Sequence, residues 1–178
     1  MTVPSDVGVR PATGEDVDTV ADMWVSLAAE QRAHGSHLLA AENRGQARDL
    51  VAQYVHADGV AVAVRGGLAV GFVMFHAETG LYETDATRGV VDNVYVRPDQ
   101  RGDGLGSALL DFAEDALCED GADVLAVEAL AANDAARRLY ERRGYQPHRV
   151  TYERPADPGT SGAGDTSTES DTHSKDDA

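Results

Sequence analysis

The fold of this chain is decided by residues 91–110, which read VDNVYVRPDQRGDGLGSALL. The first six residues alternate β-branched and aromatic types with others, which is typical of a strand. Pro98 ends this strand because it cannot donate a ladder hydrogen bond. Three glycines then let the backbone curl and approach a ligand closely: Gly102, Gly104 and Gly106. From Ser107 onward apolar residues recur every three or four positions, which predicts a helix.

The beginning of this helix predicts an anion site. Unpaired N–H groups and the helix dipole both favour negative charge at a helix N-terminus, so the stretch indicates a phosphate-bearing cofactor. Two common nucleotide motifs do not fit. A Rossmann fingerprint reads G-x-G-x-x-G, and Ser107 stands where its third glycine belongs. A Walker loop needs a lysine after its last glycine, and the chain's one lysine is Lys175.

A second informative segment covers residues 133–145, which read NDAARRLYERRGY. Asn133 is a good N-cap residue, and Gly144 suits the left-handed position that ends a helix. Ala136, Leu139 and Tyr140 share one face of that helix. Residues 124–128 before it read as a short buried strand.

Together the two segments resemble the acetyl-CoA motifs of the GCN5-related N-acetyltransferase (GNAT) family. The first is R-x-x-G-x-G, from Arg101 to Gly106, after a strand that ends in V-x-P. The second is N-x-x-A-x-x-L-Y-x-x-x-G-Y after a strand. Two motifs in the right order are far more specific than either alone, and the resemblance extends from about Val7 to Arg154.

The predicted fold class is α/β, a mixed and mostly antiparallel GNAT-like sheet flanked by helices. The expected order is β-α-α-β-β-β-α-β-α-β, which matches the arrangement known for the family. The expected elements are strand 7–11, helix 13–30 with a cap formed by Thr13 and Asp16, helix 45–56 with Leu50 inward, hairpin strands 60–64 and 68–75, strand 91–96, helix 107–120, strand 124–130, helix 134–143 and an extended stretch 147–153.

Composition predicts one folded domain, residues 1–154, and a disordered acidic tail, residues 155–178. The lone Cys118 is expected to be a small buried residue rather than a nucleophile. The net charge of −16 disfavours nucleic acid as a partner, and one lysine against fourteen arginines with no isoleucine resembles proteins of salt-loving archaea. We find no metal-ligand spacing, no signal peptide and no membrane-spanning run, so we expect a cytoplasmic protein without a metal; a homodimer is left open.

The resemblance implies acetyl-CoA as co-substrate and assigns roles to individual residues. Backbone groups of residues 94–96 (Val94, Tyr95, Val96) would hold the pantetheine arm and polarise the thioester. The amides of the glycine-rich turn would hold the pyrophosphate: Arg101, Gly102, Asp103, Gly104, Leu105, Gly106 and Ser107. The Asn133 side chain would bind the pantetheine, and Tyr140 would protonate the departing thiolate. The alternative for Tyr140 is a core aromatic of its helix.

Two carboxylates compete as the base that removes a proton from the acceptor amine. Glu128, Asn133 and Tyr140 follow the spacing E-x4-N-x6-Y, which is similar to that of the ribosomal-protein alanine N-acetyltransferases, although Ala129-Leu130 depart from their pattern. Asp92 is the competitor, expected on the same strand face as Val94. For five arginines between residues 133 and 149, we weigh phosphate contacts against an exposed helix face.

The predicted activity is acetyl-CoA-dependent acetylation of a primary amine: a protein N-terminus, a lysine or a small-molecule amine. In the family the acceptor is chosen by the segments here at 31–44 and 76–89. A non-catalytic acyl-CoA-binding or regulatory module on the same fold is the alternative. A different nucleotide-binding α/β domain is disfavoured by the glycine spacing.

Overall fold

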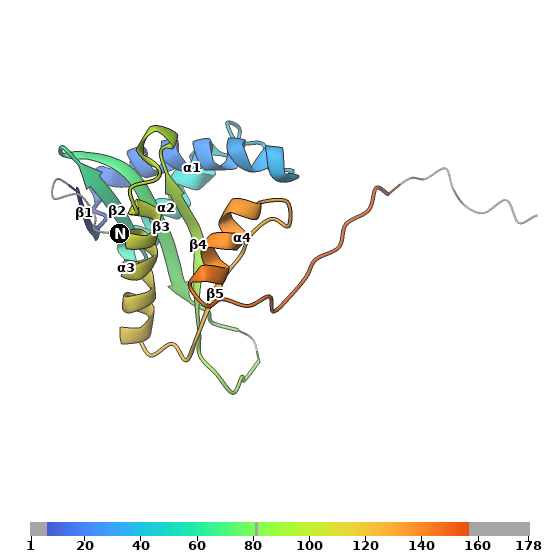
Figure 1. Ribbon diagram of the computed structural model, residues 1–178. Helices are drawn as coiled ribbons and strands as arrows, with labels where there is room; N and C mark the ends of the chain where they lie inside the picture. Colours follow the sequence, from blue (N-terminus) through green and yellow to red (C-terminus); the bar gives the residue numbers. More distant parts are fainter. Residues whose placement is uncertain (1–6, 81, 157–178) are drawn as a thin grey trace, which may run out of the picture. The chain divides into compact units, whose positions relative to one another are not determined.

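The computed structural model describes residues 7–80 and 82–156 of the chain (Figure 1). In chain order the elements are β1 (Val7–Pro11), η1 (Gly14–Asp16), α1 (Val17–Gln31), η2 (Arg32–His34), α2 (Arg44–His56), β2 (Val60–Arg65), β3 (Leu68–Ala77), β4 (Arg88–Val96), η3 (Pro98–Gln100), α3 (Leu105–Glu119), β5 (Val124–Val127) and α4 (Asp134–Arg142). All of them lie in a compact unit that ends at Gln146. The expected tail lies outside the described residues from residue 157 onward, and its disorder stays a prediction.

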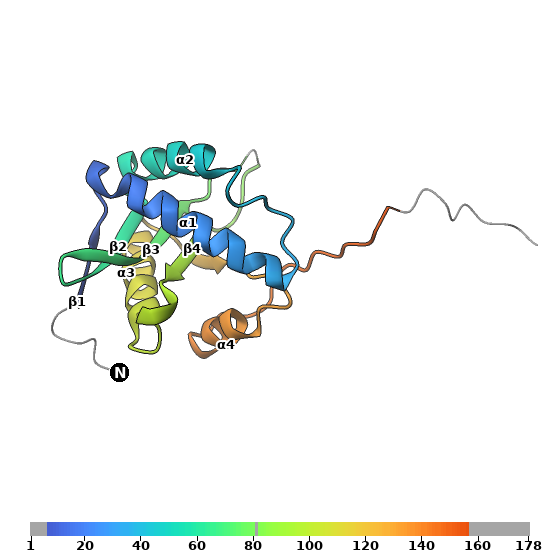
Figure 2. The same ribbon diagram turned by 90° about the horizontal axis from the view of Figure 1, so that it is seen from above.

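The strands form one sheet in the order β1-β2-β3-β4-β5. The first three pairs are antiparallel, and β4 and β5 are parallel. Helices α1 and α2 lie on one face of this sheet and α3 on the other (Figure 2). The predicted mixed, mostly antiparallel α/β fold is thereby confirmed.

Apolar side chains fill both faces of the sheet, because successive strand residues point to opposite sides. On the α3 side, Val73, Phe75 and Val91 pack against Leu109 and Leu117. On the other side, strand residues such as Phe72, Met74 and Tyr95 pack against α1 and α2. Helix α3 approaches the sheet closely at Gly89, where a Cβ would lie 2.9 Å from the Cβ of Leu117. Both faces of the sheet are therefore covered, and β4, from which the glycine-rich turn leads into α3, lies inside it.

The turn between β1 and α1 is closed by Asp16, as the sequence predicts. Its Oδ2 accepts the Thr13 backbone N–H at 2.8 Å. Arg10 donates to both carboxylate oxygens, at 2.7 and 2.9 Å. These hydrogen bonds hold the pKa of Asp16 at about 2. The buried carboxylate is thus fully paired where α1 begins.

Strand β4 carries a bulge at Asp92. Met74 of β3 pairs with Asn93, whereas Phe75 pairs with Val91, so Asp92 is the extra residue. Val94 packs on the α3 side of the sheet, while Asp92 is hydrogen-bonded to His76 on the opposite side. The expectation that Asp92 and Val94 share a face is therefore wrong, since the bulge breaks the two-residue alternation.

Three other expectations also fail. No strand forms over residues 147–153, because alternation of apolar residues creates a strand only where a sheet edge pairs with it. Cys118 is exposed: it follows the buried Leu117, whose face of α3 points into the core. Leu50 is 42% exposed, since the buried side of α2 is set by Ala47 and Val51.

The last turn of α4 is joined to α3 through Arg143. Its Nε donates to Glu114 Oε1 at 3.0 Å, and its Nη2 lies 2.6 Å from both Glu114 Oε2 and Asp111 Oδ1. Tyr145 donates its hydroxyl to the same Glu114 at 3.0 Å. The Glu114 carboxylate raises the pKa of Arg143. This arginine therefore holds α4 in place instead of facing a ligand.

Replacing Arg143 with alanine should lower the free energy of unfolding by about 1–3 kcal/mol, because Glu114 then loses its charged partner in a mostly buried position. The matched control is Arg138→Ala, since Arg138 is exposed and has no ion pair or hydrogen bond within the described ranges. Urea unfolding of both variants gives the comparison. Equal stability of the two would show that the Arg143 network does not anchor α4.

Candidate active site

The turn between β4 and α3 has the conformation that its glycines predict. Gly102 and Gly104 have φ angles of +96° and +82°, in the left-handed region that favours glycine. Gly104 is the residue directly before α3. The backbone therefore turns sharply within a few residues after η3. Its last N–H groups lie at the N-terminus of α3, a helix of 15 residues.

Six consecutive amides of this turn have no acceptor among the described residues. Within the described residues, the N–H groups from Gly102 to Ser107 donate no hydrogen bond, whereas the next amide, of Ala108, donates to Gly104 at 3.0 Å. Three of them belong to the first turn of α3, where the helix dipole adds positive potential. An anion with several oxygens, such as a pyrophosphate, satisfies donors arranged in this way.

Side chains of Arg101 and Arg65 hold the turn in place. Arg101 donates its Nε to the Val96 carbonyl at 2.8 Å and its Nη2 to Glu30 of α1 at 2.7 Å. The Arg101 guanidinium also lies over the Tyr95 ring, 5.5 Å from its centroid. Arg65 of β2 donates to Asp103 at 2.9 Å. The turn is therefore held in its shape without a ligand, which lowers the cost of binding one.

Beside the turn, strands β4 and β5 separate. Their pairing covers only residues 88–91 of β4 and ends with Val91 opposite Val127. Beyond that point, residues 92–96 pair with β3 on one side and have no strand on the other side in the described part of the chain. In the described residues this part of β4 therefore has no strand neighbour beside Val94, and the Val96 carbonyl accepts a hydrogen bond from Arg101.

Helix α4 presents two of the predicted site residues. Asn133 Oδ1 accepts the Ala136 N–H at 3.1 Å, which confirms the predicted cap and leaves its amide NH2 without a partner among the described residues. Tyr140 is 9% exposed, and burial raises its pKa to about 12. Its ring contacts that of Tyr145, with centroids 6.0 Å apart, and its hydroxyl has no hydrogen bond to any described residue.

The two candidate bases flank the point where the strands separate. Asp92 directly follows the last residue of β4 that pairs with β5, and Glu128 directly follows the end of β5. Glu128 is exposed and has no hydrogen bond or ion pair within the described ranges. Asp92, 29% exposed, lies with its Oδ2 2.8 Å from His76 Nδ1.

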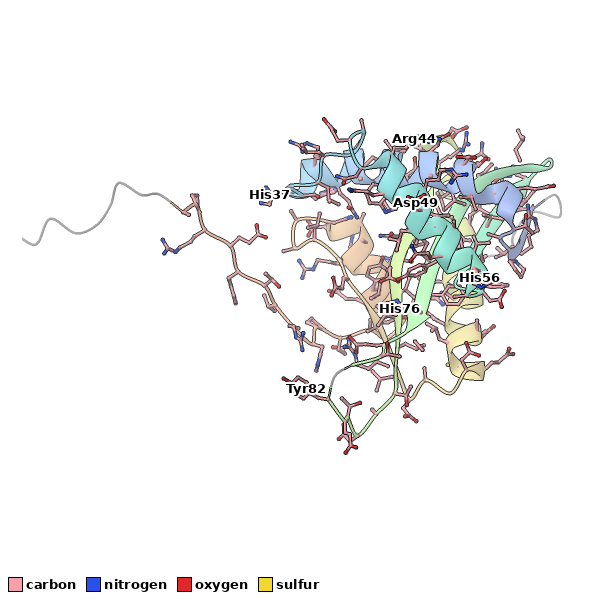
Figure 3. All side chains as sticks on the ribbon, turned by 180° about the vertical axis from the view of Figure 1, so that it is seen from behind. His37, Arg44, Asp49, His56, His76 and Tyr82 are labelled. Carbon is pink, nitrogen blue, oxygen red and sulfur yellow. The ribbon has the colours of Figure 1, made fainter. Side chains whose placement is uncertain are left out.

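His76 and Tyr54 surround Asp92, which the sequence did not predict. The Tyr54 hydroxyl lies 3.3 Å from His76 Nδ1. Figure 3 shows His76 on the side of the sheet that α2 covers. The three residues come from α2, β3 and β4, so no local spacing marks them as a group; only their tertiary contacts do.

The sequence of this chain is similar to those of known acetyltransferases. The model of a family described as the acetyltransferase (GNAT) family matches residues 30–145. The chain is 29% identical over 138 residues to the aminoalkylphosphonate N-acetyltransferase of Salmonella typhimurium, covering 78% of this chain and 84% of that protein.

Two solved structures are similar in fold. A GCN5-related N-acetyltransferase from Ralstonia eutropha superposes with a TM-score of 0.68 at 23% identity, covering 85% of this chain and 99% of the other. An aminoglycoside N-acetyltransferase in complex with CoA gives a TM-score of 0.64 at 15% identity, covering 88% and 100%. Across residues 7–80 and 82–156, each helix is too short or too polar to cross a bilayer, and no group of three or more His, Cys, Asp or Glu side chains could hold a metal ion.

Proposed function

This chain belongs to the acetyltransferase (GNAT) family, and from that premise we propose that it transfers the acetyl group of acetyl-CoA directly to a primary amine. The observation that carries this proposal is the row of six amides from Gly102 to Ser107, before and at the beginning of α3, that donate to no acceptor in the described part of the chain. Acetyl-CoA supplies the activated acyl group as a thioester. The chain's own residues bind it, orient it and move protons.

We place the cofactor along the two motifs. Its pyrophosphate binds the amides of residues 101–107, and its pantetheine arm lies along the free side of β4 at Val94 and Val96. The free amide NH2 of Asn133 donates to the arm from α4. The bracing of the turn by Arg101 and Arg65 supports a preformed site.

Backbone N–H groups of β4 polarise the thioester carbonyl where negative charge develops. The departing thiolate takes its proton from Tyr140. Because burial raises the pKa of this tyrosine to about 12, its hydroxyl keeps its proton at neutral pH. Because the hydroxyl has no partner among the described residues, the proton is available to the sulfur of CoA.

The amine must lose a proton before it attacks. A carboxylate at the strand opening, the point after Val91 and Val127 where β4 and β5 separate, assists this step. Asp92 and Glu128 are the candidates. The geometry favours Asp92 as the carboxylate that assists, either as the base itself or through the His76 ring to which it is hydrogen-bonded, because Glu128 is exposed and has no partner in the described part of the chain.

A small-molecule amine is the acceptor class that the relatives support. Two relatives in sequence are named aminoalkylphosphonate N-acetyltransferase and aminoglycoside 2'-N-acetyltransferase. In this proposal, residues around the strand opening and in the segment between α1 and α2 determine which amine is accepted as substrate. A protein N-terminus or a lysine side chain is the alternative acceptor.

Isothermal titration tests the cofactor assignment. We expect acetyl-CoA and CoA to bind with one site per chain. NADH and ATP should bind far more weakly, because neither has a pantetheine arm that could lie along β4. The titration is run at low and at molar KCl, since the net charge of −16 makes binding of an anion salt-dependent. Equal affinity for ATP and acetyl-CoA would contradict the assignment.

A further inference from the structure

We propose that His76 is the group that receives the proton from the acceptor amine, and that Asp92 and Tyr54 are positioning residues that hold its imidazole. This inference rests on the proposed acetyl transfer and adds the proton acceptor to it.

The three side chains form one connected cluster on the α2 side of the sheet. His76 Nδ1 lies 2.8 Å from Asp92 Oδ2 and 3.3 Å from the Tyr54 hydroxyl. The Tyr54 ring meets the imidazole edge-on, with centroids 5.8 Å apart and an interplanar angle of 78°. Burial and the Asp92 charge raise the pKa of Tyr54 to about 12, so Tyr54 keeps its proton and donates it to the Asp92 carboxylate. Among residues 7–80 and 82–156, Tyr54 and Asp92 are the titratable groups with a hydrogen bond or ring contact to His76.

The hydrogen bond to Asp92 decides which ring nitrogen is basic. A carboxylate can only accept, so Nδ1 carries a proton and donates it to Asp92. The neutral imidazole then has its lone pair on Nε2. Nε2 makes no hydrogen bond to any described residue, and the His76 side chain is 39% exposed. The free nitrogen can therefore reach an amine directly or through one water molecule.

The bulge places this cluster at the strand opening. His76 pairs with Val90 of β4, and Asp92 is the first β4 residue beyond the pairing with β5. The proposed pantetheine path begins two residues further, at Val94. The cluster thus lies next to the segment of β4 that would hold the thioester, where the attacking amine must arrive.

The proton balance of the transfer is complete with these groups. The ammonium gives one proton to His76 Nε2, and the freed lone pair forms the C–N bond to the thioester carbon. The C–S bond breaks, and the thiolate takes the Tyr140 proton. The second proton that the amide nitrogen loses returns to Tyr140 through solvent, and the His76 proton leaves as the net H⁺ of the reaction. The Asp92 carboxylate stabilises the imidazolium in between.

The experiment compares three variants with the parent: His76→Ala, Asp92→Asn and, as a matched control, His56→Gln at the exposed end of α2 (Figure 3). For His76→Ala we expect kcat to fall by about 10²–10⁴ while the acetyl-CoA affinity by titration stays that of the parent. Added imidazole should restore part of the rate. The deficit should also narrow as pH rises, because more of the amine is then already deprotonated.

Asp92→Asn should lower kcat without rescue by imidazole, because the ring is present but loses its charged partner. His56→Gln should match the parent. His76→Gln serves as a second variant of similar size in case His76→Ala does not fold, which circular dichroism and acetyl-CoA binding report.

Full activity of the His76 variants, with the loss found instead in Glu128→Gln, would overturn the role of His76 and leave the proposed acetyl transfer intact. A loss in His76→Ala that neither imidazole nor higher pH reduces would make His76 structural and would also overturn the inference. A parent that does not bind acetyl-CoA would overturn the proposed function itself.

Discussion

Replacing Gly104 with valine should abolish acetyl-CoA binding while the protein stays folded. Gly104 has a φ of +82°, a conformation that costs a residue with a Cβ about 1–2 kcal/mol, and a β-branched residue more. A valine escapes this strain by turning the backbone away from the left-handed region. That movement redirects the amides on both sides of residue 104, so the array that binds the pyrophosphate is lost. We expect affinity to fall more than about 100-fold, equivalent to about 2.7 kcal/mol.

Gly106→Ala is the matched control for this variant. Its backbone is not in the left-handed region, and a Cβ there would have its nearest neighbour, Val96 Cγ2, at 4.0 Å. Acetyl-CoA affinity should therefore be retained. Titration calorimetry measures both variants, with circular dichroism to verify the fold. Unchanged affinity in Gly104→Val would remove the glycine-rich turn from the cofactor site.

Replacing Tyr140 with phenylalanine should lower kcat by about 10²–10⁴, the usual contribution of a general acid. The ring and its contact with Tyr145 are kept, so stability and acetyl-CoA affinity should change little. Because burial raises the pKa of Tyr140 to about 12, its proton is present throughout pH 7–10, and the deficit of the variant should be constant over that range. Rapid-quench or steady-state thiol release measures the effect.

An acyl donor with a more acidic thiol provides the control for this substitution. Its thiolate needs less protonation, so part of the lost rate should return in Tyr140→Phe but not in variants of the base. If Tyr140→Phe is as active as the parent on its true acceptor, the tyrosine is a core aromatic. The thiolate then takes its proton from water.

Local patterns in the sequence predicted the parts of the molecule whose structure is set by neighbouring residues. The glycine-rich turn, the Asn133 cap and the Thr13–Asp16 cap each depend on backbone geometry within a few positions, so their residue types alone indicate them. The order of the elements from β1 to α4 followed from apolar periodicity, whereas the expected last strand over residues 147–153 does not form. Both acetyl-CoA motifs lie on elements of the predicted type.

Features that depend on contacts between distant elements could not be predicted in this way. The bulge at Asp92 arises from the register of β4 against β3, and nothing in residues 91–96 marks it. The cluster around His76 joins α2, β3 and β4. Arg143 and Glu114, which connect the end of α4 to α3, are 29 positions apart in the sequence. Cys118 is exposed for a related reason. Apolar periodicity shows which face of a helix is buried, but it does not show whether a residue at the edge of that face is covered by the rest of the fold.

The central claim, acetyl transfer from acetyl-CoA to an amine, is tested most directly by a reaction that follows both products. The parent protein is mixed with acetyl-CoA labelled in its acetyl group and with a panel of small amines, lysine peptides and peptides with free N-termini. Free thiol is measured together with labelled amine by mass spectrometry. We predict one equivalent of free CoA for each amine that gains the label. Tight binding of acetyl-CoA with no labelled amine in any member of the panel would contradict the claim and would identify a non-catalytic acyl-CoA-binding module.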